Sequence, residues 1–115
     1  MMATNHIATQ LRSHHALIVG AGGLGGPIAL SLAQAGIAKI TICDDDFVEI
    51  SNLQRQIQFK TEDVGKPKVT RLAAALDQYK NTKVIVQRKR FTQANSEELT
   101  RGVTLIIDGS DNFST

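Results

Sequence analysis

The chain has 115 residues, of which 42% are hydrophobic and 21% are charged, and its formal net charge is +2. This length and composition predict one globular domain that buries about two-thirds of the surface its unfolded form would expose. The charge is too small to indicate nucleic acid or a membrane surface as a partner. A single cysteine, Cys43, has no partner for an internal disulfide, and we expect it to be buried as a small hydrophobic residue.

The first 14 residues are polar and lack the apolar core of a secretory leader. We treat 1–14 as an N-terminal segment and 15–115 as the domain, without a role for His14 or His15. Residues 16–38 carry no charge over a length that would span a bilayer, but six glycines and Pro27 interrupt them. We therefore expect a cytoplasmic protein without a membrane partner.

Residues 16–19 form an apolar run that is followed by a glycine-rich stretch and then by alanine and leucine. This pattern predicts a strand, a tight turn and a helix over about 24–35, with Pro27 in its first turn and Gly36 as its C-terminal cap. Glycine allows the backbone to approach a phosphate closely, and the N–H groups at the helix start attract anions. The glycines of the GxGxxG spacing and its neighbourhood are Gly20, Gly22, Gly23 and Gly25.

A second strand, 39–43, ends on the acidic triplet Asp44, Asp45 and Asp46. In nucleotide-binding βαβ units, a carboxylate at this position binds the ribose. The glycine turn and the acid together predict a nucleotide site, but they do not say which nucleotide binds.

Polar side chains follow the acidic triplet in the run Ser51-Asn-Leu-Gln-Arg55-Gln. A dehydrogenase needs no such run, whereas a guanidinium binds phosphate through two hydrogen bonds and amides orient it. We therefore expect these residues to hold the triphosphate of ATP. The alternative is a solvated loop in which Arg55 pairs with the acidic triplet.

Apolar residues at helical spacing predict a helix over 67–80 that starts at Pro67. Lys68 opposes the dipole of this helix, which is easier to explain if the ammonium group meets an anion. An ordinary surface lysine is the alternative.

The remaining predicted elements are a strand over 83–87, a short helix over 95–101 and a buried strand over 103–107. We interpret the basic run 88–90 as a solvated strand end. The whole pattern predicts an α/β fold with a doubly wound parallel sheet of about four strands, in the order 3-2-1-4, and flanking helices. Strands one and four are then neighbours, which brings Asp111 and Asn112 beside the glycine turn.

Five motifs in this order resemble those of the ThiF/MoeB/HesA family, bacterial relatives of the ubiquitin-activating enzymes: GAGGLGGP, DDD, SNLQRQ, VGKPKV and DGSDN. The resemblance covers about residues 10 to 115 and implies a Rossmann-like domain, the N-terminal nucleotide-binding half of such a protein. It implies ATP-dependent adenylation of the C-terminal carboxylate of a ubiquitin-like sulfur-carrier protein, as in molybdopterin or thiamine biosynthesis, by a homodimer.

The resemblance also implies residue roles. The glycine turn would lie against ATP, Asp44 would bind the ribose, and Asp111 would support Mg²⁺, which offsets charge on the leaving group. The expected catalytic residues are Arg55, Lys68 and Asp111. The expected nucleotide-binding residues are Gly20, Gly22, Gly23, Gly25, Asp44, Asp46, Ser51, Asn52, Arg55, Lys68, Asp111 and Asn112.

The paired CxxC zinc ligands and the carrier-binding groove of the family have no counterpart in this sequence. We therefore expect that the chain alone does not complete the adenylation. Two alternatives remain at this stage: a non-catalytic nucleotide-binding module that associates through an exposed sheet edge, and an NAD-binding Rossmann domain.

Overall fold

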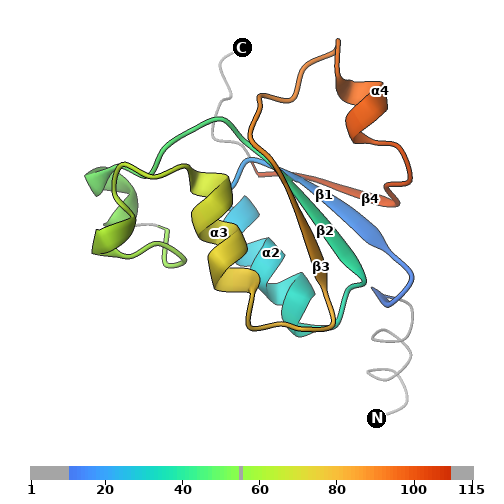
Figure 1. Cartoon of the computed structure of the whole chain (residues 1–115), viewed down its shortest axis with the longest axis horizontal. Coiled ribbons are helices and arrows are strands. Elements are labelled where there is room, and N and C mark those ends of the chain that lie inside the picture. Colours follow the sequence, from blue (N-terminus) through green and yellow to red (C-terminus); the bar gives the residue numbers. More distant parts are fainter. Residues whose placement is uncertain (1–10, 55, 110–115) are drawn as a thin grey trace.

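A computed structural model describes residues 11–54 and 56–109, which form one parallel sheet with helices packed against it (Figure 1). The strands are β1 (His15–Val19), β2 (Lys39–Cys43), β3 (Lys83–Gln87) and β4 (Leu105–Asp108). The α-helices are α2 (Gly25–Gln34), α3 (Lys68–Leu76) and α4 (Ser96–Leu99), and two 3-10 helices, η1 (Ile50–Gln54) and η2 (Thr61–Asp63), lie between β2 and α3.

The sheet has the order β3-β2-β1-β4, and all three strand pairs are parallel. This confirms the predicted order 3-2-1-4. The central strand β1 is buried over Ala16, Leu17 and Ile18, as expected for a strand covered on both faces. In the register, Val19 lies opposite both Cys43 and Asp108. The carboxyl ends of β1, β2 and β4 are therefore level, and the loops that follow them start at the same edge.

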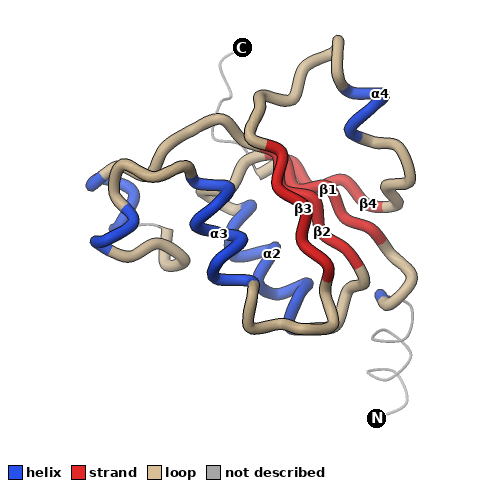
Figure 2. The backbone as a smooth tube through the Cα atoms, viewed as in Figure 1, coloured by secondary structure: helices blue, strands red, loops and turns tan. Residues whose placement is uncertain are grey.

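Two layers of unequal size cover the sheet (Figure 2). Helices α2 and α3 pack on one face, where Ile18 and Ile42 meet Leu72 and Leu76 in the main hydrophobic core. The segment that contains α4 lies on the other face, over a smaller cluster of buried residues formed by Leu17, Cys43 and Leu99. Most of the apolar burial, and hence most of the stabilisation, belongs to the first face.

The helices end close to their predicted boundaries, with one clear difference. Gly36 has a φ of 93° and ends α2 as expected. The helix predicted over 67–80, α3, stops at Leu76. Two turns follow it, in which the Tyr79 N–H donates to the Leu76 carbonyl and the Thr82 N–H donates to the Tyr79 carbonyl. The Thr82 hydroxyl also donates to the Ile37 carbonyl at 2.7 Å, immediately before β3 begins.

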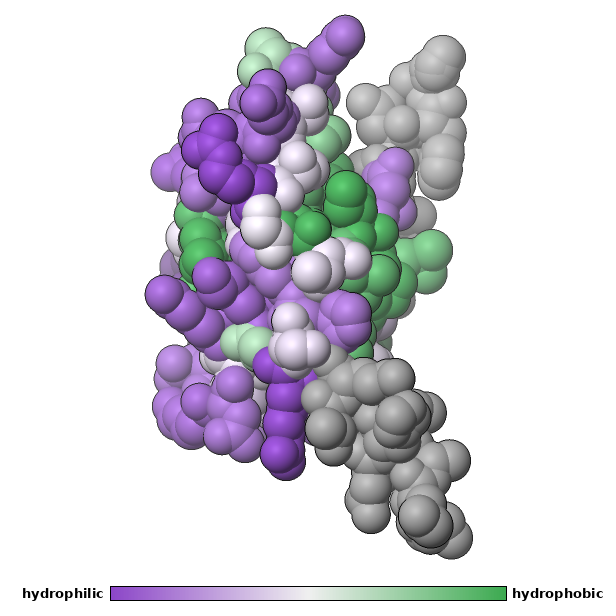
Figure 3. Space-filling view, turned by 90° about the vertical axis from the view of Figure 1, so that its right-hand side faces the viewer, coloured by the Kyte–Doolittle hydropathy of each residue, from purple (hydrophilic) through white to green (hydrophobic). Residues whose placement is uncertain are grey.

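None of the helices in the two described ranges is long and apolar enough to cross a membrane. On the side of the molecule seen in Figure 3, the main hydrophobic area lies right of the centre, and smaller hydrophobic areas lie among the hydrophilic regions. The edge strand β4 contributes exposed apolar surface, because the side chain of Ile106 is 53% exposed. Among the described residues, β4 pairs with β1 alone and is an edge strand of the sheet.

Candidate functional site

A cleft of about 500 Å³ opens at the carboxyl edge of the sheet. All four strands contribute to it, either by their last residue or by the residues that follow. Its walls are Val19, Gly20, Gly22, Cys43, Phe91 and Gly109, and its charged groups are Asp44, Asp45, Asp46, Lys68 and Arg90. Ligands of doubly wound sheets bind at this edge, so the cleft is the candidate site.

We call residues 20–26 the glycine turn; it consists of the turn between β1 and α2 and the first two residues of α2, and its Gly20 and Gly22 line the cleft. Gly20 has a φ of 96°, and its N–H donates to the Cys43 carbonyl at 2.9 Å. A Cβ atom on Gly25 would lie 1.9 Å from the Gly20 carbonyl oxygen, so any side chain there would force the turn away from the helix. The turn is compact because its two ends are in backbone contact.

Three consecutive N–H groups of this turn have no acceptor in the part of the chain that the structure describes. Within residues 11–54 and 56–109, the N–H groups of Gly22, Gly23 and Leu24 make no hydrogen bond. They directly precede α2, a helix of 10 residues, whose dipole is positive at this end. Unpaired donors and a helix N-terminus at the edge of a cleft form a site suited to phosphate.

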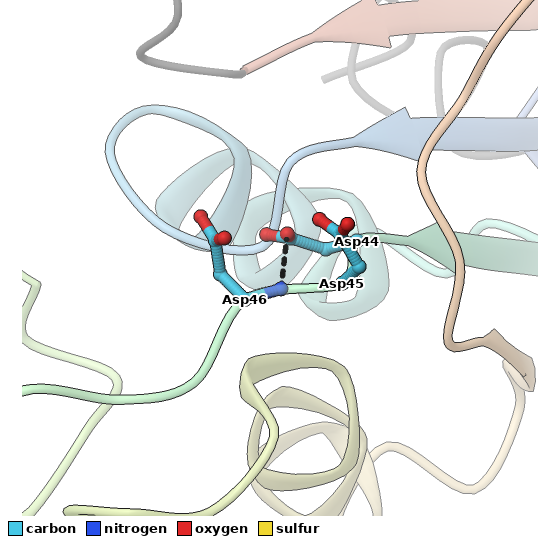
Figure 4. Close-up of side chains that lie close together, drawn as sticks. All are labelled: Asp44, Asp45 and Asp46. Atoms are coloured by element: carbon cyan, nitrogen blue, oxygen red, sulfur yellow. Dashed lines mark hydrogen bonds between the residues drawn. The ribbon is translucent and has the colours of Figure 1, made fainter.

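Asp44 fixes the other side of the turn. Its Oδ2 accepts a hydrogen bond from the Ala21 N–H at 2.7 Å, and its Oδ1 accepts one from the Asp46 N–H at 2.9 Å, which Figure 4 shows. Each carboxylate oxygen has a further lone pair. The Asp44 carboxylate is thus held in place while it can still accept hydrogen bonds from a ribose.

Lys68 lies at the same cleft because backbone hydrogen bonds join residues 46–48, which follow β2, to residues 66–68 at the start of α3. The N–H of Val48 donates to the Lys66 carbonyl at 2.8 Å, and the N–H of Lys68 donates to the Asp46 carbonyl at 2.9 Å. Lys68 is only 7% exposed, so the alternative of an ordinary surface lysine is wrong. The structure places an ammonium group beside the acidic triplet.

The acidic triplet is crowded. One carboxylate oxygen from each of Asp44, Asp45 and Asp46 lies within 4.8 Å of the others. Burial raises the pKa of Asp46, the negative charge of Asp44 raises it further, and Lys68 opposes both effects. The cleft therefore combines negative charge at the end of β2 with two cationic groups, Lys68 and Arg90.

The predicted site residues divide into three groups. Gly20, Gly22, Asp44, Asp46 and Lys68 line the cleft, and Gly23 and Gly25 lie in the turn beside it. Ser51 is exposed in η1 and does not line the cleft, and Asn52 also belongs to η1. Arg55, Asp111, Asn112 and the side chain of Asn52 lie outside the part of the chain that the structure describes.

Sequence reasoning missed Arg90 and Phe91. Arg88 and Arg90 are exposed, in agreement with a solvated strand end. Arg90 and Phe91 also line the cleft, and the Arg88 guanidinium lies 5.1 Å from the centre of the Phe47 ring. The reason is that β3 pairs with β2, so the residues after β3 face the same edge. The predicted strand order already contained this signal.

Cys43 is 1% exposed, as predicted, and also lines the cleft. Its thiol donates to the Lys89 carbonyl at 3.1 Å. Burial raises the pKa of this thiol to about 11, with a further contribution from the negative charge of Asp44. The raised pKa disfavours the thiolate, which is the reactive form, at neutral pH.

Known proteins resemble this chain in sequence and in fold. The sequence profile of the ThiF family matches residues 4–115. The chain is 42% identical over 108 residues to the SAMP-activating enzyme E1 of Haloferax volcanii. It is 41% identical over 108 residues to the sulfur carrier protein adenylyltransferase of Thermus thermophilus. Each alignment covers 92% of this chain and 40% of the relative.

Among solved structures, the Escherichia coli tRNA N6-threonylcarbamoyladenosine dehydratase TcdA in complex with ATP superimposes with a TM-score of 0.86 and 29% identity. That match covers 96% of this chain and 49% of TcdA. The chain therefore spans less than half the length of these relatives. Because the family profile covers nearly the whole sequence, the chain belongs to the ThiF family.

Proposed function

We propose that this chain is the ATP-binding part of an adenylyltransferase that activates the C-terminal carboxylate of a ubiquitin-like sulfur carrier. The observation that carries the proposal is a cleft lined by Gly22, the buried Lys68 and the fixed Asp44. The N–H groups of Gly22, Gly23 and Leu24, which have no acceptor among the described residues, lie in the turn at this cleft. Two relatives, from Thermus thermophilus and E. coli, are named for adenylation of a sulfur carrier.

In this proposal each part of ATP meets a matching part of the cleft. The ribose hydroxyls donate to Asp44, whose carboxylate is held by the Ala21 N–H. The adenine lies toward the apolar wall of Val19 and Phe91. The phosphates lie toward the start of α2 and Lys68, where the unpaired N–H groups and the ammonium group offset their charge.

The proposed reaction is a displacement at phosphorus. The carrier carboxylate attacks the α-phosphorus, a carboxyl oxygen to phosphorus bond forms, and the bond to the β-phosphate oxygen breaks to release pyrophosphate. Catalysis of this kind depends on positioning and on stabilising negative charge on the transferred and leaving oxygens. Lys68 is the described residue suited to the second task, and no side chain need form a covalent bond.

Mg²⁺ belongs to the proposal as the ion that would offset the negative charge of the phosphates and of the pyrophosphate that leaves. The donor chemistry fits, because Mg²⁺ prefers carboxylate oxygens and three carboxylates cluster at the end of β2. Both Asp44 oxygens already accept backbone N–H groups, so Asp45 and Asp46 are the freer ligands. The role predicted for Asp111 is retained as a proposal.

The partners are also part of the proposal. We infer a ubiquitin-like sulfur carrier as the protein substrate and a homodimer as the assembly. The exposed side chain of Ile106 on β4 supports association of the chain, because apolar surface left in water favours burial against a partner.

Titration calorimetry with ATP and Mg²⁺, and separately with NAD, tests the nucleotide assignment. We expect measurable binding of ATP and weaker binding of NAD, since the cleft offers a phosphate-binding lysine close to the ribose acid. Asp44→Ala should weaken both ligands, whereas Asp77→Ala, an exposed aspartate at the end of α3, should change neither. Equal or tighter binding of NAD would contradict the proposal.

A further inference from the structure

Two glutamine side chains are buried against the glycine turn, on the segment that follows η1. Gln56 is 1% exposed and Gln58 is 8% exposed. The Gln58 Nε2 donates to the Ala21 carbonyl at 3.0 Å, but the Oε1 atoms of both glutamines have no hydrogen-bond partner among the described residues. Buried acceptors without donors reduce stability, so stability alone does not explain why these glutamines are there.

The carboxamides press directly on the turn at two glycines. A Cβ atom on Gly22 would lie 2.6 Å from the Gln56 Oε1, and a Cβ atom on Gly26 would lie 2.0 Å from the Gln58 Nε2. Neither position has room for a side chain. The absence of Cβ atoms at these glycines therefore makes room for the carboxamides of Gln56 and Gln58.

The contact at Ala21 also sets the direction of a neighbouring donor. The Ala21 carbonyl and the Gly22 N–H belong to one planar, trans peptide group and point in opposite directions. Because Gln58 binds the carbonyl, the Gly22 N–H is directed away from Gln58. Gly22 lines the cleft, and on its other side the N–H of Ala21 is held by Asp44. Both peptide groups that flank Ala21 are thus fixed by side chains.

We propose that Gln58, with Gln56 beside it, is a positioning residue that holds the glycine turn in its phosphate-binding conformation. The inference rests on the proposed function, because ATP is the ligand whose phosphates the turn receives. Gln58 does not touch the nucleotide in this account; it acts through the peptide group between Ala21 and Gly22.

A role in packing alone makes a different prediction. Leucine at position 58 fills a similar volume and removes one unpaired acceptor, but it leaves the Ala21 carbonyl without its donor. Removing the unpaired acceptor raises stability, and leaving the Ala21 carbonyl without a donor lowers it, so the two effects on stability oppose each other. The substitution also removes the contact that orients the Gly22 N–H. If Gln58 only packs, stability and ATP affinity should fall together.

The test compares Gln58→Leu with Gln78→Leu. Gln78 is the matched control, because its Nε2 also donates to a backbone carbonyl, that of Ala75 at 3.1 Å, but at an exposed position. ATP and adenosine affinities are measured by calorimetry, and thermal unfolding is followed for each variant. Amide hydrogen exchange without nucleotide is measured at Ala21, Gly25 and Gly26, whose N–H groups are hydrogen-bonded within the turn.

For Gln58→Leu we expect about tenfold weaker ATP binding, the effect of one misaligned hydrogen bond, and unchanged adenosine binding. The unfolding midpoint should change by less than about 5 °C, and exchange at Ala21, Gly25 and Gly26 should be faster. Gln78→Leu should behave as the wild type in every measurement. If Gln58→Leu does not fold, Gln58→Met, which keeps the unbranched chain and lacks the amide, must give the same results.

Two outcomes would overturn the inference. Unchanged exchange in the turn of the Gln58 variant would show that Gln58 does not hold it. Parallel losses of stability, ATP affinity and adenosine affinity would show a packing role only. If the wild type binds no ATP, the proposed function fails, and the exchange comparison still decides whether Gln58 holds the turn.

Discussion

The glycine turn 20–26 and the segment 50–63 lie against each other, yet they are built in opposite ways. The turn is defined by backbone contacts, such as that between the Gly20 N–H and the Cys43 carbonyl. The segment is held by side chains, including Gln58 and Asp63, and exposes Ile50 by 74% and Ile57 by 81%. The comparison teaches that main-chain contacts shape the turn, while side chains join the segment to the turn and hold the peptide groups on both sides of Ala21.

The strongest way to break this comparison is to add a side chain inside the turn. Gly25→Ala places a Cβ atom 1.9 Å from the Gly20 carbonyl oxygen and should cost about 3 kcal/mol of unfolding free energy. It should also abolish ATP binding. Urea unfolding and calorimetry measure the two effects.

Gly65→Ala is the control for this change. Gly65 has a φ of 89° and no atom within 4 Å of an added Cβ, so only backbone strain of about 1 to 2 kcal/mol is expected. Its ATP affinity should equal that of the wild type. An equal loss of affinity in both variants would show that the turn has no special role.

Lys68→Ala tests the cation that borders both regions. Loss of one charge-assisted contact should weaken ATP binding by about 1.5 to 3 kcal/mol, and adenosine binding should not change. Lys66→Ala, two residues earlier at an exposed position, is the control for loss of charge. Equal losses for ATP and adenosine would mean that Lys68 supports the fold rather than the phosphates.

Asp63→Asn tests how the side-chain-held segment is attached. Asp63 Oδ1 lies 3.0 Å from the Arg71 Nε of α3 in an ion pair, while its Oδ2 accepts from the Lys60 N–H at 2.7 Å. Asparagine keeps the acceptor and loses the charge, so we expect a loss of about 1 to 2 kcal/mol in unfolding free energy.

The matched control is Asp77→Asn, which removes the exposed ion pair to Lys80 at 3.3 Å and should cost less than about 0.5 kcal/mol. If the two variants lose the same stability, the Asp63 pair is no better than a surface pair, and the segment must be held by other contacts.

The smallest expected effect is the change in unfolding free energy with pH that comes from ionisation of Asp46. Because the pKa of Asp46 is raised in the folded state, chiefly by burial, the folded chain binds more protons than the unfolded chain as the carboxyl titrates. Ionisation therefore lowers stability as pH rises above about 4. Asp46→Asn should be more stable than the wild type at pH 7 and not at pH 3, as measured by urea unfolding. A larger gain at pH 3 would contradict this assignment.

The parts of the fold that could be predicted from the sequence are those whose residues favour one backbone conformation, such as glycines in a tight turn and apolar runs in buried strands. The glycine turn, the acid after β2 and the order of the strands follow from such residues, and the structure has them. Residues 50–63 were harder, because two 3-10 helices and two buried glutamines leave no periodic signal. Arg90 and Phe91 were missed for another reason: their role depends on the pairing of β3 with β2, which places them at the cleft.

The most direct test of the central claim is amide NMR of the chain during titration with ATP and Mg²⁺. The account predicts that the largest shifts occur at Gly22, Gly23 and Leu24, the unpaired N–H groups at the start of α2, and that adenosine reproduces few of them. Shifts that are absent from these three amides, or largest at remote glycines such as Gly65 and Gly102, would contradict the claim that this turn binds phosphate.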